Sequence, residues 1–190
     1  MFGTVDMHSM QEINAIFEVN FFGAIRMTNA VLPIMRKQNE GRVICLSSIS
    51  GVIPSKFLPI YSAAKAALEF VSANYAAYNA KWNILFSNIQ PGPVVTDFET
   101  ATAFPTGLKD ADNPYVNEMS TWRVDWKKMM EKGQHVNEVA EVIHSALEDR
   151  DPKFWYQTTP TVAESIGTHF KDLTGKRRIP VGLPVSAARK

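Results

Sequence analysis

The sequence has almost no cysteine and no strong bias of charge, and each shortage excludes a class of protein. Cys45 is the only cysteine, so an intrachain disulfide cannot form and a secreted disulfide framework is not expected. The net charge of +1 gives no electrostatic basis for binding nucleic acid. The few histidines lack the spacing of zinc ligands, so we expect no metal site. They are His8, His135, His144 and His169.

Long hydrophobic runs are also missing. No stretch reaches the ~18 apolar residues that a membrane-spanning helix needs, and residues 1–6 lack the basic and apolar regions of a signal peptide. We therefore expect a cytoplasmic protein. Residues 176–190 form a basic C-terminal tail, which we interpret as solvated or as making a weak contact with a membrane surface.

What the sequence does contain is an alternation of helical and strand-like patterns. Apolar residues recur at helical spacing in four segments, and three short apolar runs between them are typical of buried parallel strands. The expected helices are 10–37, 59–80, 137–149 (capped by Asn137) and 160–170, and the expected strands are 42–47, 84–90 and 154–158. This order predicts an α/β fold with a parallel sheet.

The region between Phe98 and Met130 is rich in aromatic residues and methionine. Two interpretations remain open for it. It could form a mobile lid over an apolar substrate, or it could be a separate hydrophobic cluster, since large aromatic side chains mostly serve packing.

Tyr61 and Lys65 are the most informative pair in the chain. Four residues apart on a helix, they share a face. At about 4 Å and an effective dielectric of about 20, an ammonium attracts a phenolate by roughly 4 kcal/mol. This could lower the pKa of a tyrosine from about 10 by up to ~3, which suits general acid/base chemistry. Taken alone, the pair could equally be an exposed lysine beside a packed tyrosine.

Other polar residues are expected at the same edge of the sheet. Ser47 and Ser48 end the first strand and Pro91-Gly92-Pro93 ends the second, while Tyr61 and Lys65 open the helix between them. Ligands of such folds bind at the carboxyl ends of the strands. Either serine could face this crevice.

At this point the sequence resembles the short-chain dehydrogenase/reductase family. Tyr61 follows Ser48 by thirteen residues and precedes Lys65 by four. The run 17–20 with Gly23 resembles the helix that carries the family's asparagine, and 91–96 resembles its nicotinamide turn. Three further runs are most similar to the 17-beta-hydroxysteroid and retinol dehydrogenase branch. They are 41–44, 137–142 and 156–159.

The resemblance implies a catalytic set of four residues. Tyr61 would donate or accept the proton of the reacting hydroxyl or ketone, and Lys65 would assist it and bind the nicotinamide ribose. Ser48 would hold the substrate oxygen, and Asn20 would support a water in a proton relay. The implied activity is NAD- or NADP-dependent oxidation or reduction of a small alcohol or ketone, apolar like a steroid or a retinoid, by a homodimer.

The resemblance also implies where the cofactor binds. Tyr61 and Lys65 would share the nicotinamide side with the turn after the second strand, where the Val94 backbone could hold the carboxamide. The turn residues assigned to the cofactor are Pro91, Gly92, Val94 and Thr96.

The glycine-rich turn that cradles phosphates in this family is absent from the sequence. The resemblance then implies one partial Rossmann-type domain, 1–175, equivalent to the second half of a doubly wound parallel sheet with flanking helices. The strand 42–47 would become a sheet edge. We therefore expect these residues to bind a dinucleotide poorly or not at all.

Two alternatives to an oxidoreductase are an interaction module and a hydrolase. A catalytically inactive chain could act as an interaction module through helices 10–37 and 59–80, which pair between subunits in the family. A hydrolase is less well supported, because the sequence has no G-x-S-x-G motif and no histidine at a strand end near Ser48.

Overall fold

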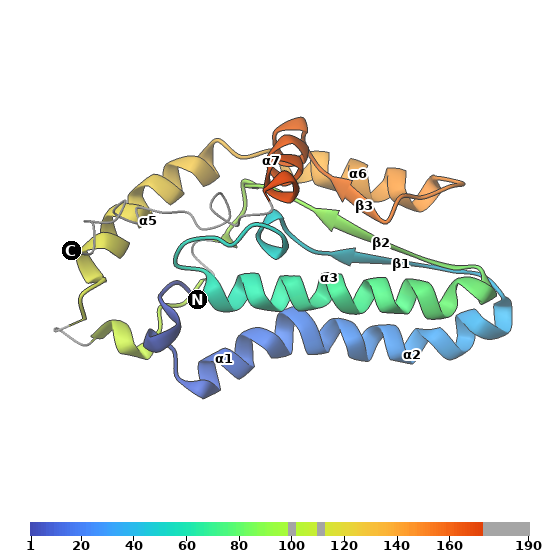
Figure 1. Cartoon of the computed structure of the whole chain (residues 1–190), viewed down its shortest axis with the longest axis horizontal. Helices are drawn as coiled ribbons and strands as arrows, with labels where there is room; N and C mark the ends of the chain where they lie inside the picture. Colours follow the sequence, from blue (N-terminus) through green and yellow to red (C-terminus); the bar gives the residue numbers. More distant parts are fainter. Residues whose placement is uncertain (99–101, 110–112, 173–190) are drawn as a thin grey trace, which may run out of the picture.

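The computed structural model describes residues 1–98, 102–109 and 113–172. Its centre is a parallel sheet in the order β1-β2-β3, with bounds Gly41–Leu46, Ile84–Gln90 and Trp155–Gln157. The expected α/β fold with a parallel sheet is confirmed (Figure 1). Within the described part of the chain β1 pairs only with β2, so it is an edge strand, as expected.

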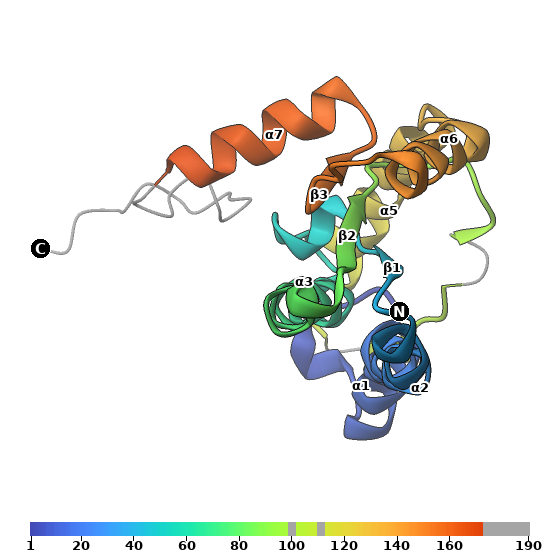
Figure 2. The same ribbon diagram turned by 90° about the vertical axis from the view of Figure 1, so that its right-hand side faces the viewer.

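Helices cover both faces of this sheet. On one face α2 (Gly23–Gln38) packs on β1, and α3 (Pro59–Asn79) packs on β2. On the other face α6 (Val136–Glu148) packs on β1 and β2, while α7 (Pro160–Lys171) contacts β3 and lies at that edge of the sheet (Figures 1 and 2). The predicted order of helices and strands is therefore correct.

The first helical region is not one continuous helix, and this expectation was wrong. α1 (Met10–Phe17) begins at Ser9, whose side chain and that of Glu12 form a capping box. A π-helical turn, Glu18–Phe22, then separates α1 from α2. An inserted π turn leaves the apolar spacing on both sides helical, so the sequence pattern does not reveal it.

The start of α6 also differs from the prediction. His135, not Asn137, is the N-cap, and its ring Nδ1 accepts a hydrogen bond from the Asn137 backbone N–H at 3.2 Å. Glu138 completes the cap by accepting from the His135 backbone N–H at 2.6 Å. Histidine is rarely chosen as a cap from sequence, because Ser, Thr, Asp and Asn lead at that position.

Two apolar cores hold the helices on the sheet. Between α2, α3 and the sheet lies a buried cluster of Leu32, Ile84 and Phe86. Against α6, Ile89 packs with two apolar residues of that helix. Because both faces of β2 are covered, its side chains are buried at almost every position, as the apolar run predicted.

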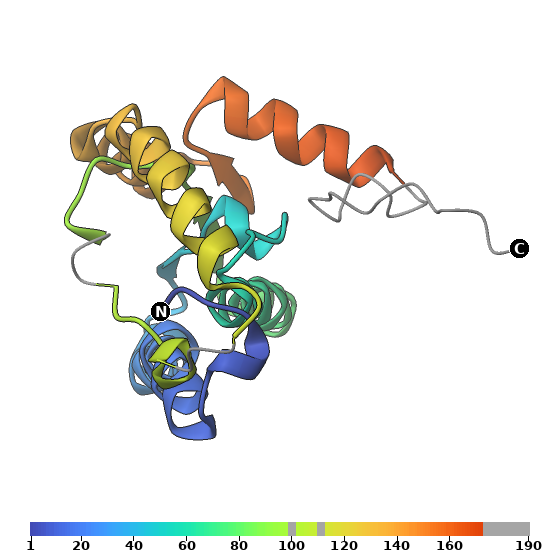
Figure 3. The same cartoon turned by 90° about the vertical axis from the view of Figure 1, so that its left-hand side faces the viewer.

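A third cluster joins the N-terminal segment to the helix α5 (Val116–Glu131). The Phe2 ring is 1% exposed and packs edge-on against Trp122 and Trp126 at 5.5 and 4.9 Å between centroids. Figure 3 shows α5 running from the start of α6 toward this segment. The aromatic stretch is therefore a packed helical wall in its described part.

The predicted basic tail, 176–190, lies outside the described residues, so the structure does not describe it. No helix in the described ranges combines the length and apolarity required to cross a membrane.

Candidate active site

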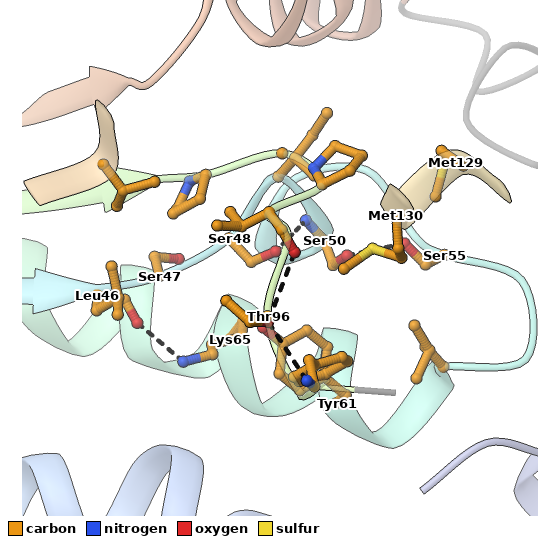
Figure 4. A pocket seen from close by; sticks show the side chains of 18 of the residues that line it. Leu46, Ser47, Ser48, Ser50, Ser55, Tyr61, Lys65, Thr96, Met129 and Met130 are labelled. Carbon is orange, nitrogen blue, oxygen red and sulfur yellow. Dashed lines mark hydrogen bonds between the residues drawn. The ribbon is translucent and has the colours of Figure 1, made fainter. Parts of the chain in front are cut away.

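A cavity of about 550 Å³ opens at the carboxyl ends of β1 and β2 (Figure 4). Every residue that was assigned to the site from the sequence lines this cavity, together with a larger set of apolar residues. The predicted residues are Asn20, Ser48, Tyr61, Lys65, Pro91, Gly92, Val94 and Thr96. The structure therefore brings together side chains from α3, the π-helical turn and the loops that follow two strands.

Tyr61 lies in the first turn of α3 and is largely buried in this cavity. Burial raises the pKa of its hydroxyl above the usual value, and a hydrogen bond with Ser48 lowers it by a smaller amount. The hydroxyl is consequently protonated at neutral pH. A protonated phenol beside a serine hydroxyl can donate a proton to an oxygen held between them.

Lys65 lies one turn further along α3. Its Nζ donates a hydrogen bond to the Leu46 carbonyl oxygen at 2.8 Å, and it lies 5.6 Å from the centroid of the Tyr61 ring. Burial lowers the pKa of Lys65. The expectation that the ammonium lowers the Tyr61 pKa is wrong for this arrangement, since desolvation dominates at both groups.

The two serines at the end of β1 have different surroundings. The Ser48 Oγ accepts a hydrogen bond from the Ser50 backbone N–H at 3.0 Å and caps the turn Ile49–Gly51. Of the two serines, Ser48 is the one whose hydroxyl lowers the pKa of Tyr61. Ser47 also lines the cavity, but its Oγ is buried without a hydrogen-bond partner.

Asn20 reaches the cavity from the π-helical turn. Its Nδ2 donates to the Ile16 carbonyl oxygen at 3.0 Å, which leaves the side-chain oxygen free to accept another bond. Single π turns inside helices occur often at functional sites. The sequence identified this asparagine only through the family resemblance.

The turn after β2 is held by backbone hydrogen bonds on two sides. The Ile49 N–H donates to the Pro91 carbonyl at 2.8 Å, and the Gln134 N–H donates to that of Pro93 at 3.0 Å. Val95 N–H in turn donates to the Gln134 carbonyl at 3.0 Å. No pattern in the sequence indicates this role of Gln134, because its partners are about forty residues away along the chain.

Gly92 is required in this turn by its close approach to α7. A Cβ built at this position would lie 2.7 Å from Cγ2 of Val162. A larger residue would therefore push the turn away from the helix or into the cavity.

The rest of the cavity is apolar. Phe98 packs against the Tyr61 ring at 5.6 Å between centroids, and Trp126 and the adjacent methionines of α5 continue this wall. Lys65 is the one cationic side chain among the described lining residues, and no carboxylate is among them. The arrangement is an acid/base and hydrogen-bonding group at the end of an apolar chamber.

Comparisons with known proteins agree with this geometry. The family model for short chain dehydrogenase matches residues 1–104. Human retinol dehydrogenase 8 is 38% identical over 97 residues, which are 51% of this chain and 31% of that protein. Human 17-beta-hydroxysteroid dehydrogenase type 1 is 27% identical over 182 residues, 94% of this chain and 56% of that protein.

Solved structures show the same fold. A short chain dehydrogenase/reductase from Burkholderia phymatum, in complex with NAD, superposes with a TM-score of 0.76 at 23% sequence identity. The superposition covers 97% of this chain and 66% of that one. A short-chain dehydrogenase from Streptomyces avermitilis gives the same TM-score over 90% of this chain and 60% of its own. The chain spans about half the length of the curated relatives it matches.

Proposed function

Because the chain belongs to the short-chain dehydrogenase family, we propose that it carries the proton-transfer half of an NAD- or NADP-dependent oxidoreductase that acts on a hydroxyl or ketone. One observation carries the proposal. Ser48, Tyr61 and Lys65 line one cavity together with the turn after β2, at the carboxyl ends of β1 and β2.

The nicotinamide end of the cofactor fits the residues that are present. The turn Pro91–Thr96 and the Lys65 ammonium line the same cavity, and Ser47 offers a buried hydroxyl that has no partner. A cofactor bound there would supply or accept the hydride. Complexes of two structural neighbours with NAD and with NADP support a dinucleotide without deciding between the two.

The residues of this chain would handle the proton. In the reducing direction Ser48 holds the carbonyl oxygen and the Tyr61 hydroxyl donates its proton to that oxygen. The raised pKa of Tyr61 keeps this hydroxyl protonated before the reaction. Lys65 keeps two further N–H donors beside its bond to the Leu46 carbonyl, and Asn20 is placed to accept a bond from a water between the side chains.

We propose an apolar substrate that carries no charge. A carboxylate or phosphate would meet only Lys65, while an ammonium would meet no anionic side chain among the described lining residues. The names of two relatives, a retinol dehydrogenase and a 17-beta-hydroxysteroid dehydrogenase, support a retinoid-like or steroid-like alcohol or ketone.

A homodimer is part of the same proposal. Several large apolar side chains are exposed on α2, on the π-helical turn before it and on α3, where a second copy could cover them. They include Val19, Met27, Ile34, Phe70 and Tyr78. Light scattering on purified protein would give the mass of a dimer, and a mass of one chain at micromolar concentration would contradict it.

The test of the enzymatic proposal is oxidation of estradiol or retinol with millimolar NAD or NADP, followed through the absorbance of the reduced nicotinamide. Tyr61→Phe should reduce turnover at least 100-fold, since the proton donor is lost. Tyr78→Phe removes a hydroxyl from an exposed tyrosine of the same helix and should have no effect. Equal turnover in Tyr61→Phe and the unmodified chain would exclude the mechanism.

The second candidate function, an interaction module, makes the opposite prediction. It is favoured by the exposed apolar residues of α2 and α3 together with the limited span of the chain relative to its relatives. No turnover by the unmodified chain at millimolar cofactor, with stable dimers in solution, would favour this function over the enzyme.

A further inference from the structure

A buried carboxylate ties the helix that carries Tyr61 to the ends of β2 and β3. Glu69, on α3, accepts hydrogen bonds from Nε2 of Gln90 at 3.0 Å and from Nε1 of Trp155 at 2.8 Å. Nε2 of Gln157 then donates to Oε1 of Gln90 at 2.6 Å. Four side chains from three elements thus form one chain of hydrogen bonds.

Glu69 fixes the direction of every bond in this chain. Its carboxylate can only accept, so the amide NH2 of Gln90 must face it and the Gln90 oxygen must face away. That oxygen in turn requires the NH2 of Gln157. One acidic residue therefore sets the orientation of two amides at the carboxyl ends of neighbouring strands.

Stability alone does not account for a carboxylate here. Glu69 is 8% exposed, and among the described residues no cation forms an ion pair with it. Burying a charge that is held only by neutral donors is costly, and an apolar residue of similar size often serves the core as well. What the carboxylate adds is a defined geometry between the elements that it joins.

The elements joined are the two that form the site. Glu69 follows Lys65 by one helical turn, and Gln90 immediately precedes Pro91, the first residue of the turn that lines the cavity. We propose that Glu69 is a positioning residue, which holds the turn Pro91–Thr96 at a fixed place relative to Tyr61 and Lys65. This inference deepens the proposed function and rests on it for its catalytic consequence.

A second buried bond between the same helix and strand provides a matched control. Ser72 Oγ lies 3.0 Å from Oδ1 of Asn88 and 2.7 Å from its Nδ2. It joins α3 to β2 as Glu69 does, but one strand repeat further from the turn. Loss of this bond should weaken the core without moving the turn.

The experiment compares Glu69→Gln, Ser72→Ala and the double exchange Glu69→Gln with Gln90→Glu. In Glu69→Gln the volume stays constant but the charged acceptor is lost, and all the bonds can form only if the amides of Gln90 and Gln157 both turn over, which reverses the direction that Glu69 imposes. In the double exchange the new carboxylate at position 90 can accept from both amides, and the new oxygen at position 69 can accept from Trp155. All the bonds are then restored.

Two measurements are made on each variant. Amide hydrogen exchange is followed at Ile49, Val95 and Gln134, whose N–H groups hold the turn or bond to its neighbours. Turnover of estradiol or retinol is followed at a fixed millimolar cofactor concentration. We expect exchange roughly tenfold faster and turnover roughly tenfold slower in Glu69→Gln, because the bonds from Gln90 and Trp155 lose their charged acceptor and the turn is held less firmly.

The double exchange should restore both quantities, and Ser72→Ala should lower the urea midpoint without changing exchange at the three amides. Wild-type exchange in Glu69→Gln, or the same acceleration in Ser72→Ala, would overturn the positioning role. The exchange result stands even where the unmodified chain shows no turnover. That outcome would refute the proposed function but not the role of Glu69 in placing the turn.

Discussion

Lys65 donates from Nζ to the carbonyl oxygen of Leu46 at 2.8 Å, so the end of β1 holds the ammonium that is expected to assist Tyr61. In the same position Nζ lies 5.6 Å from the centroid of the Tyr61 ring, and two of its three N–H groups remain available to other acceptors.

Replacement of Lys65 by Met should separate its chemical role from its structural one. We expect turnover to fall at least 100-fold, because Tyr61 loses its cationic neighbour, while the urea midpoint is kept or raised because a desolvated charge is removed. Lys81→Met, on the surface, is the control. A large drop in the urea midpoint would contradict this view of Lys65.

The same variant should also change how the stability of the fold depends on pH. The pKa of Lys65 is lower in the folded chain than in the unfolded chain, so protonation favours unfolding. The stability that the neutral amine contributes is present above about 10.5 and is lost as the pH falls through the folded value. Urea titrations from alkaline to neutral pH should therefore show the wild type losing stability relative to Lys65→Met.

Phe2→Ala should be among the most damaging changes at the N-terminal end. The Phe2 ring is fully buried against Leu58 and Trp126, so its removal leaves a cavity behind the wall of the site. We expect a loss of about 3–5 kcal/mol of unfolding free energy. Phe170→Ala, at a residue that is 56% exposed, should cost far less. Similar urea midpoints for the two variants would show that Phe2 is not part of the core.

The thiol of Cys45 should react only slowly in the folded chain. Burial raises the pKa of its thiol to about 11, so very little thiolate exists at neutral pH. A thiol reagent should modify it slowly without denaturant and rapidly in urea. The raised pKa also predicts stability that is present below pH 9 and lost as the pH rises through 11, a loss that Cys45→Ala should lack. Rapid labelling of the folded chain would refute this.

Dinucleotide affinity is expected to be weak. The cavity offers residues only for the proposed nicotinamide side, and the sequence contains no glycine-rich turn of the kind that cradles a pyrophosphate. Titration of NADH fluorescence should therefore give no saturation in the micromolar range. A micromolar dissociation constant would show that the chain binds phosphates by residues that the sequence did not indicate.

Much of the fold follows from local patterns in the sequence. β2 has the predicted bounds, Ile84–Gln90. β1 lies one residue earlier than predicted at both ends, and α3 ends one residue earlier. Each of these elements has an apolar pattern that ends at a clear stop, such as Pro91 after β2. The proposed site residues come from the family resemblance, which the spacing of Ser48, Tyr61 and Lys65 supports.

What could not be predicted depends on contacts between distant residues. The Lys65 ammonium is held by a backbone carbonyl, which carries no sequence signal. In the sequence Glu69 is one polar residue of an alanine-rich helix, and only the fold shows that Trp155 donates a hydrogen bond to it. The pKa of Tyr61 depends on how far the cavity buries its hydroxyl. The sequence therefore indicates which residues lie near Tyr61, but not the direction of its pKa shift.

The packing of Phe2 against Trp126 has a consequence for biosynthesis. Phe2 finds this partner only after the whole of α3 and β2 has been made. Parallel pairing of β2 with β3 comes later still, because Trp155 must be available. Such long-range contacts close large loops and slow folding. During synthesis the Phe2 ring therefore stays uncovered until α5 has been made, and this interval is when a chaperone would be needed most.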